Sequence, residues 1–171
     1  MKKKFFILVS IITALICIEY TPVYVKAESY VTISNPKSAS TKYPTKKKIK
    51  KIIGHSAKTI KKFSNGFKFK NYNTSNIDIL DKNNEKVGGY KQIHITYSKD
   101  KEEVVLFINE EHESEYDDEG TKFTFNDIEL RYISAYQTIT WNDNGISYSI
   151  LASDCNLSED ILFEMAKDII E

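Results

Sequence analysis

Apolar and polar residues alternate in short runs from residue 67 to residue 150, and this pattern restricts the fold more than any other feature. An alternation with a period of two places the apolar side chains on one face of a β-strand. The alternating runs are residues 67–70, 77–79, 90–97, 123–125, 128–132, 139–141 and 146–150. The continuous apolar run 104–108 is typical of a central strand. Asn144-Gly145 predicts a tight hairpin, and further turns are expected at 81–85 and 88–89.

Apolar residues with helical spacing precede and follow this region. The first set predicts a helix over residues 46–63, ended by Ser64-Asn65-Gly66, and consists of Ile49, Ile52, Ile53, Ala57, Ile60 and Phe63. The second set follows the N-cap residue Ser158, with Leu157 placed to pack on Leu162, and consists of Ile161, Leu162, Met165, Ala166, Ile169 and Ile170. The predicted fold class is α+β: a mostly antiparallel sheet of about six to eight strands with an N-terminal and a C-terminal helix packed on it.

The first 27 residues have the composition of a secretory signal peptide. Lys2, Lys3 and Lys4 precede an uncharged, mostly apolar run over residues 5–18, and Val25-Lys26-Ala27 resembles a cleavage site. A helix of that run would span about 21 Å, which is short of the roughly 30 Å hydrocarbon core, so cleavage after Ala27 is favoured over an uncleaved membrane anchor. We therefore expect a secreted, extracytoplasmic protein with a signal peptide at 1–27, a flexible leader at 28–45 and a single α+β domain at 46–171. Cleavage would leave Cys155 as the one cysteine and exclude an internal disulfide.

Charge divides the mature chain into two unequal parts. Residues 28–76 contain 12 Lys and one acid, whereas residues 77–171 contain 22 acids and 8 bases. This asymmetry indicates either a binding surface or two solvated faces of opposite sign. Arg131 is the one arginine beside 23 lysines, so the guanidinium groups that read nucleic-acid bases are almost absent and a nucleic-acid partner is not expected.

Lysines surround the apolar stripe of the predicted helix over residues 46–63. The candidate anion-docking residues are Lys47, Lys50, Lys51, Lys58, Lys61 and Lys62. Such a helix can dock on a phosphate-rich wall glycopolymer or on a membrane surface, and the latter use requires a free apolar stripe. The alternative is that the stripe packs on the protein's own sheet.

Seven acids occur within residues 110–119, where a hard cation such as Ca²⁺ could find oxygen ligands. The candidate cation-binding residues are Glu111, Glu113, Glu115, Asp117 and Asp118. The segment lacks the register of an EF-hand loop, and the alternative interpretation is a solvated hairpin loop.

No spacing in the sequence predicts catalysis. The three histidines show none of the usual metal-ligand spacings, and the sequence of residues 54–58 lacks the second glycine of a nucleophile elbow. His94 lies between Ile93 and Ile95 on a predicted strand, so its side chain is expected on the opposite face, toward solvent. We therefore expect no enzyme activity, no cofactor and no resident metal.

The end of the chain resembles domain-of-unknown-function family 4367. The resemblance rests on Trp141, Asn144-Gly145, the aromatic strand around Tyr148, and the Leu-Ser-acid-acid sequence that opens the last helix at Leu157. Residues 67–69 followed by Tyr72 are similar to the family's opening aromatic strand, although this chain lacks the prolines that the family usually has there. The resemblance covers about residues 66–170 and implies an extracytoplasmic α+β module of Gram-positive cell envelopes. It implies no catalytic residues.

These observations predict an exported, non-catalytic module that binds a cell-envelope component or a partner protein. The alternative is a carrier or chaperone-like protein that holds an apolar ligand on a curved sheet. The chain has 11 Tyr, 9 Phe and one Trp, which suit both hypotheses, because aromatic residues line cores and grooves alike. An internal cavity would favour the carrier, whereas a filled core with a charged face would favour the binding module. A membrane contact is expected only through an uncleaved leader.

Overall fold

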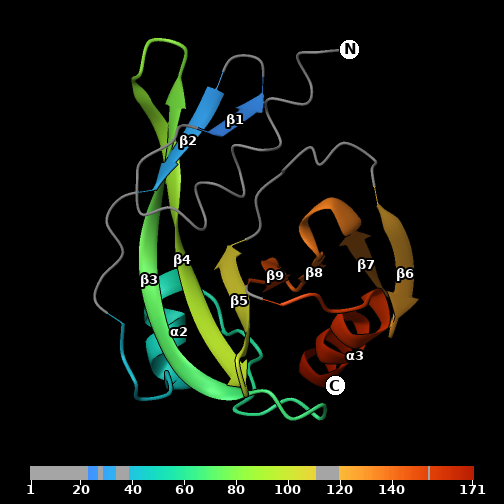
Figure 1. Cartoon of the computed structure of the whole chain (residues 1–171). Coiled ribbons are helices and arrows are strands. Elements are labelled where there is room, and N and C mark those ends of the chain that lie inside the picture. Colours follow the sequence, from blue (N-terminus) through green and yellow to red (C-terminus); the bar gives the residue numbers. More distant parts are fainter. Residues whose placement is uncertain (1–22, 27–28, 34–38, 111–119, 154) are drawn as a thin grey trace.

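The computed structural model describes residues 23–26, 29–33, 39–110, 120–153 and 155–171 (Figure 1). Its strands are β1 (Val23–Lys26), β2 (Ser29–Ile33), β3 (Lys68–Asp81), β4 (Lys86–Lys99), β5 (Glu102–Glu110), β6 (Thr121–Phe125), β7 (Ile128–Ile133), β8 (Thr138–Asp143) and β9 (Ile146–Ala152). Its helices are α2 (Lys46–Ile53), the 3-10 turn η1 (Ser134–Tyr136) and α3 (Glu159–Ile170). In this part of the chain, no helix is long and apolar enough to cross a membrane.

The described strands form one antiparallel sheet in the order β1-β2-β3-β4-β5-β9-β8-β7-β6. Strands β3 to β9 make up its body, which confirms the mostly antiparallel sheet expected from the sequence. The chain runs along neighbouring strands as far as β5 and then re-enters the sheet at the far edge with β6. It returns strand by strand until β9 pairs with β5. The apolar run 104–108 therefore lies in mid-sheet, as its composition predicts.

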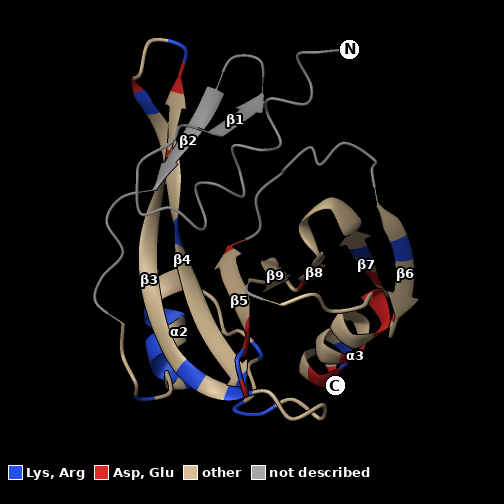
Figure 2. Cartoon of the chain, in the orientation of Figure 1, with Lys and Arg blue, Asp and Glu red and all other residues tan. Residues whose placement is uncertain are grey.

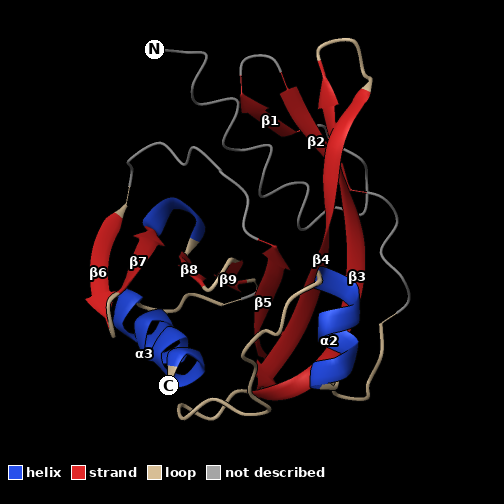
Figure 3. Cartoon of the chain, turned by 180° about the vertical axis from the view of Figure 1, so that it is seen from behind, coloured by secondary structure: helices blue, strands red, loops and turns tan. Residues whose placement is uncertain are grey.

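One face of the sheet carries the core. The register aligns Ile95 with Leu106, Leu106 with Ile150, and Ile150 with Ile139, and each of these four side chains is fully buried. Helix α2 packs against β4 and β5, while α3 packs against β8, and the buried side chains of both helices belong to the same cluster as this face (Figure 3). Burial of apolar residues from both layers is the main term that holds the helices on the sheet.

Helix α2 is shorter than predicted, because it ends at Ile53 rather than at Phe63. Gly54 adopts a left-handed conformation (φ 79°) and its N–H donates to the carbonyl of Lys50, which closes the helix. Residues 54–63 instead form a segment without regular secondary structure, hereafter the strap, which buries Ala57 and Phe63 against the core. Ser64-Asn65-Gly66 ends this strap rather than a helix: Phe63 N–H donates to Phe67 O at 2.8 Å, and the chain turns into β3.

Helix α3 agrees with its prediction almost residue by residue. The Ser158 hydroxyl accepts a hydrogen bond from Ile161 N–H at 3.4 Å, and Glu159 and Asp160 occupy the first turn. Leu157 and Leu162 are both buried in the core cluster. Of the predicted apolar face only Ile161 is exposed, at 37%. The buried residues are Leu162, Met165, Ala166, Ile169 and Ile170.

Three further details differ from the predicted pattern. The alternating runs 67–70 and 77–79 belong to one long strand, β3, because the polar residues between them continue the pairing with β4. Gly88-Gly89 lies inside β4 rather than in a turn, and a Cβ on Gly89 would lie 2.5 Å from the Ile77 carbonyl oxygen. Residues 29–33 of the expected flexible leader form β2, which pairs with β3, and Ser40 bridges to Tyr72. Of the expected signal peptide at 1–27, residues 23–26 form β1, which pairs with β2, and the remainder lies outside the described residues.

Candidate functional site

Eight exposed lysines gather where α2, the end of the strap and the start of β3 meet, and they are called the lysine surface below (Figure 2). They are Lys46, Lys47, Lys48, Lys50, Lys51, Lys61, Lys62 and Lys68. Lys62 pairs with Lys68 across a β-bridge, and the Lys48 ammonium lies 5.1 Å from the centre of the Tyr72 ring on β3. None of these eight ammonium groups forms an ion pair with a carboxylate of the described residues.

The local sequence explains why α2 presents its lysines to solvent. The Thr45 hydroxyl accepts a hydrogen bond from Lys48 N–H at 3.2 Å and so begins the helix. Ile49 and Ile53 lie on one side of α2 and are 0% and 4% exposed. The lysines occupy the remaining positions of this amphipathic helix, whose apolar side is held by the sheet. Of the predicted anion-docking residues, Lys47, Lys50 and Lys51 therefore lie together on α2, and Lys61 and Lys62 lie on the adjoining strap.

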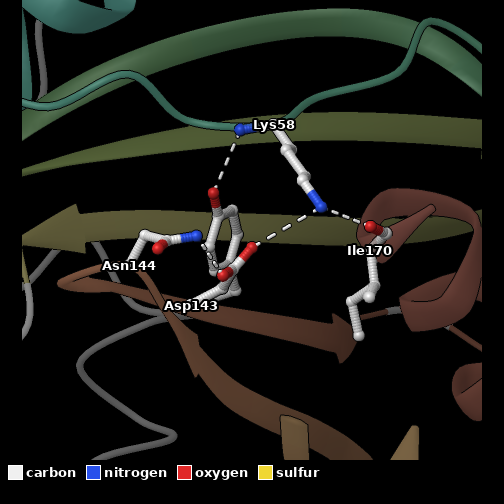
Figure 4. Close-up of polar contacts among 5 residues, drawn as sticks. Lys58, Asp143, Asn144 and Ile170 are labelled. Atoms are coloured by element: carbon white, nitrogen blue, oxygen red, sulfur yellow. Dashed lines mark hydrogen bonds and ion pairs between the residues drawn. The ribbon is translucent and has the colours of Figure 1, made fainter. Parts of the chain in front are cut away.

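Lys58, the sixth predicted anion-docking residue, makes contacts within the protein instead, and its docking role stays a prediction. Its ammonium group donates a hydrogen bond to the carbonyl of Ile170 at the end of α3 and lies 3.7 Å from Asp143 Oδ2 (Figure 4). Its backbone N–H donates to Tyr148 Oη at 3.0 Å. Lys58 therefore holds the strap to the β8–β9 hairpin and to the negative end of the α3 dipole. The predicted helix over residues 46–63 would have placed Lys58 on its exposed side, whereas α2 ends at Ile53.

The partners of Lys58 are themselves held in place by packing. The Tyr148 ring stacks on Trp141 with the two planes 3° apart, and the Asn144 side-chain amide donates to Asp143 Oδ1. Burial raises the pKa of the Tyr148 hydroxyl to about 12, and the Asp143 charge adds to this effect, while the hydrogen bond from Lys58 N–H opposes it. These contacts tie the strap to β8, β9 and the end of α3.

A second polar cluster lies on the face of the sheet opposite the core. His94 Nε2 lies 3.0 Å from Ser75 Oγ and 2.8 Å from Gln92 Oε1, and Gln92 donates to Asn109 at 3.1 Å. The His94 ring also meets Phe107 edge-on at 4.8 Å. The opposite-face prediction for His94 is confirmed, but the ring is largely buried rather than directed into solvent, and this burial lowers its pKa to about 4.

This histidine cluster lacks the elements of a hydrolytic triad. No carboxylate of the described residues hydrogen-bonds the His94 ring, and a histidine with so low a pKa is a weak base at neutral pH. Ser75 is itself buried at 4% exposure between neighbouring strands. The hydrogen bonds of His94 and Gln92 satisfy half-buried polar side chains in the middle of the sheet, which is a structural role.

A shallow groove of about 290 Å³ lies between the turn after the strap and the first two turns of α3. It is lined by Ser64, Asn65, Asp160, Ile161 and Glu164. The turn is anchored to α3 because Ser64 N–H donates to Asp168 Oδ2 at 2.7 Å. Asp160 lies in the first turn of α3, where an acid stabilises the helix through its dipole, so its presence at the groove has a structural explanation.

The candidate cation-binding residues Glu111, Glu113, Glu115, Asp117 and Asp118 lie outside the described residues. Within the described part of the chain, no three His, Cys, Asp or Glu side chains are grouped as metal ligands. The cation hypothesis therefore stays a prediction.

Sequence reasoning missed Lys46, Lys48 and Lys68 as members of the lysine surface. For Lys46 and Lys48 a signal was available: Thr45 is an N-cap residue, and three lysines with no acid follow it directly. A first turn with that composition is unusual, because a helix N-terminus favours anions.

Comparisons with known proteins agree with the resemblance seen in the sequence. A search of curated proteins returned no match, and neither did a search of solved structures. The family model described as a domain of unknown function, DUF4367, matches residues 64–169, which include β3 to β9 and nearly all of α3. Because this match spans more than half of the 171 residues, the protein belongs to the DUF4367 family.

Proposed function

We propose that this protein is an exported, non-catalytic module that binds a component of the cell envelope through its lysine surface. Residues 1–27 serve as the export signal, and residues 46–171 act as a single α+β domain with α2 and α3 packed on the sheet. The proposal deepens the family assignment, which carries no activity of its own.

The observation that carries the proposal is the unpaired charge of the lysine surface. Several lysines elsewhere in the described chain have carboxylate partners: Lys70 pairs with Glu103, Lys86 with Asp78, and Lys167 with Glu164. The lysine surface has none among the described residues, although the same helix buries Ile49 and Ile53 and partly buries Ile52. A charged, solvent-facing patch on a well-packed helix suits an anionic partner.

The packing supports a binding module over a carrier. A carrier needs an unfilled apolar space on the sheet, and in the described structure α2, the strap and α3 cover that face. Leu106, Ile139 and Ile150 at its centre are each 0% exposed, with side chains from α3 in the same cluster. The groove beside Asn65 is open and lies at the edge of α3.

The test is sedimentation of the purified protein with envelope fractions at low and at high salt. We expect binding at low ionic strength that disappears at about 0.5 M salt, because exposed charges separated by more than a Debye length are screened. The triple variant Lys47→Glu/Lys50→Glu/Lys51→Glu should lose this binding.

A matched control carries the same charge change elsewhere, in the variant Lys82→Glu/Lys91→Glu/Lys122→Glu. Lys82 and Lys91 are exposed and lie at the β3–β4 turn and on β4, while Lys122 lies on β6 at the far edge of the sheet. Envelope binding that survives the α2 variant, or that is lost equally in the control, would show that the lysine surface is not the binding site. N-terminal sequencing of the secreted protein tests the export signal, with Glu28 as the expected first residue.

A further inference from the structure

The first turn of α2 carries the wrong charge for a helix start. Lys46, Lys47 and Lys48 occupy it, and it contains no acid. Helix dipoles place partial positive charge at the N-terminus, so cations there are disfavoured and anions are favoured. The same chain follows the favourable rule at α3, where Glu159 and Asp160 come directly after the N-cap. Positive potential therefore accumulates at the start of α2 and is not compensated by any described side chain.

The buried side of α2 excludes one way of using these lysines. An interfacial helix enters a bilayer with its apolar face, and here that face is occupied by the core, with Ile49 at 0% and Ile53 at 4% exposure. Inserting it would unpack α2 from β4 and β5. Contact must therefore be made by the lysine side chains alone, at the water-exposed side of the helix.

The residue type and the layout indicate a polymer rather than a single small anion. Lysine ammonium groups are mobile point charges, and they lack the fork that captures one phosphate or carboxylate with two parallel hydrogen bonds. The eight lysines are spread over a helix, a strap end and a strand rather than around a pocket. A surface of this kind gains affinity by neutralising several repeated charges at once and by releasing their counterions.

We propose that the lysine surface binds a linear phosphodiester polymer, without insertion into a membrane, and that the first turn of α2 is the centre of the contact. This inference rests on the proposed function and names its ligand class. A phosphodiester supplies one permanent negative charge per repeat and oxygen acceptors for ammonium groups. The lysines of the first turn lower the stability of α2, and they are present because they bind the polymer.

The decisive variant is Lys46→Glu/Lys47→Glu/Lys48→Glu, measured in protein purified after expression of the full chain. Lys48 lies three residues after the N-cap Thr45, so glutamate there completes a capping box, and acids in the first turn match the dipole. The variant should therefore unfold at a higher temperature than the wild type. Its affinity for poly(glycerol phosphate) should fall about 100-fold, and the slope of log affinity against log salt should decrease by about three. A merely structural role of these lysines would not give higher stability together with lost binding.

Three probes define the ligand class, and Lys82→Glu/Lys91→Glu/Lys122→Glu again serves as the control. The polymer should bind the wild type and the control within about twofold of one another, and glycerol 3-phosphate should bind at least about 100-fold more weakly than the polymer. Tighter binding to phosphatidylglycerol vesicles than to the polymer would overturn the inference, as would equal binding of polymer and monomer, or full binding by the first-turn variant. Salt-sensitive envelope binding without polymer binding would refute the ligand class and leave the proposed function standing. Loss of both would refute both.

Discussion

Replacement of Lys58 by methionine tests how the strap is held. Methionine keeps most of the aliphatic stem and removes the ammonium group, while the backbone N–H that donates to Tyr148 remains. The variant therefore isolates two contacts, the hydrogen bond to the Ile170 carbonyl and the 3.7 Å ion pair with Asp143.

The expected loss of unfolding free energy follows from the exposure of the groups. The Lys58 side chain is 48% exposed, so its charged hydrogen bond and its position at the α3 C-terminus are each worth about 1 kcal/mol or less. The Asp143 side chain is only 13% exposed and loses its cation, which adds a fraction of a kcal/mol. The sum is about 2 kcal/mol, and for a chain of this length it lowers the unfolding midpoint by about 6 °C.

Urea unfolding followed by Trp141 fluorescence measures this change directly. Trp141 is the one tryptophan, is buried and stacks on Tyr148, so its emission reports on the region beside the strap. The control Lys82→Met alters an exposed lysine at the tip of the β3–β4 hairpin and should change the unfolding free energy by less than about 0.5 kcal/mol. If Lys58→Met is as stable as this control, Lys58 does not hold the strap. A cycle with Asp143→Asn should give a coupling of about 0.5 kcal/mol between the two side chains.

Three other expectations can be checked by unfolding measurements. The pKa of His94 is lowered to about 4, below its unfolded value near 6.5, so its contribution to wild-type stability should be present above pH 6.5 and fall by about 2–3 kcal/mol at pH 4.5. The His94→Gln variant should lose less stability over that range, and a pH profile equal to that of the wild type would contradict the burial of the ring. Gly89→Ala should destabilise the hairpin by about 1–3 kcal/mol, because its Cβ meets the Ile77 carbonyl oxygen at 2.5 Å, whereas Gly88→Ala makes only an ordinary 3.6 Å contact and should be nearly neutral. Met165→Ala removes a fully buried side chain of α3 and should lower the free energy of unfolding by about 2–5 kcal/mol. Ile161→Ala changes a side chain that is 37% exposed and should lower it by less than half as much. Equal losses would show that α3 is not packed on the sheet through the side that carries Met165.

The local sequence pattern was sufficient to predict α3 and the hairpin at Asn144-Gly145, where both turn residues have positive φ. The N-cap, the first-turn acids and the apolar spacing of α3 all indicate the same helix with the same start. A prediction is reliable when independent sequence signals agree in this way. Asn126-Asp127 forms an equivalent two-residue turn with φ of 49° and 62°, yet it escaped notice because it lacks glycine.

The end of α2 could not be read from spacing alone. Ala57 and Phe63 continue the helical period, and both are buried, but the non-helical strap buries them as effectively as a helix would. Periodicity reports burial and not backbone conformation. Gly54 after Lys50 and Lys51 was the competing stop signal, and it prevailed. The exposed positions of the lysines on α2 were therefore predictable, whereas the contacts of Lys58 depend on a partner more than 100 residues away.

Strand order was the least predictable feature, because the pairing of β5 with β9 joins segments separated by three other strands along the chain. This arrangement has a kinetic consequence. Contacts between distant segments slow folding, because loop-closure entropy is lost before they form. Until β9 has been synthesised, the second edge of β5 is an unpaired apolar template for other chains. We therefore expect nascent chains that lack β9 to aggregate, and expect rapid folding only once the last third of the polypeptide has emerged.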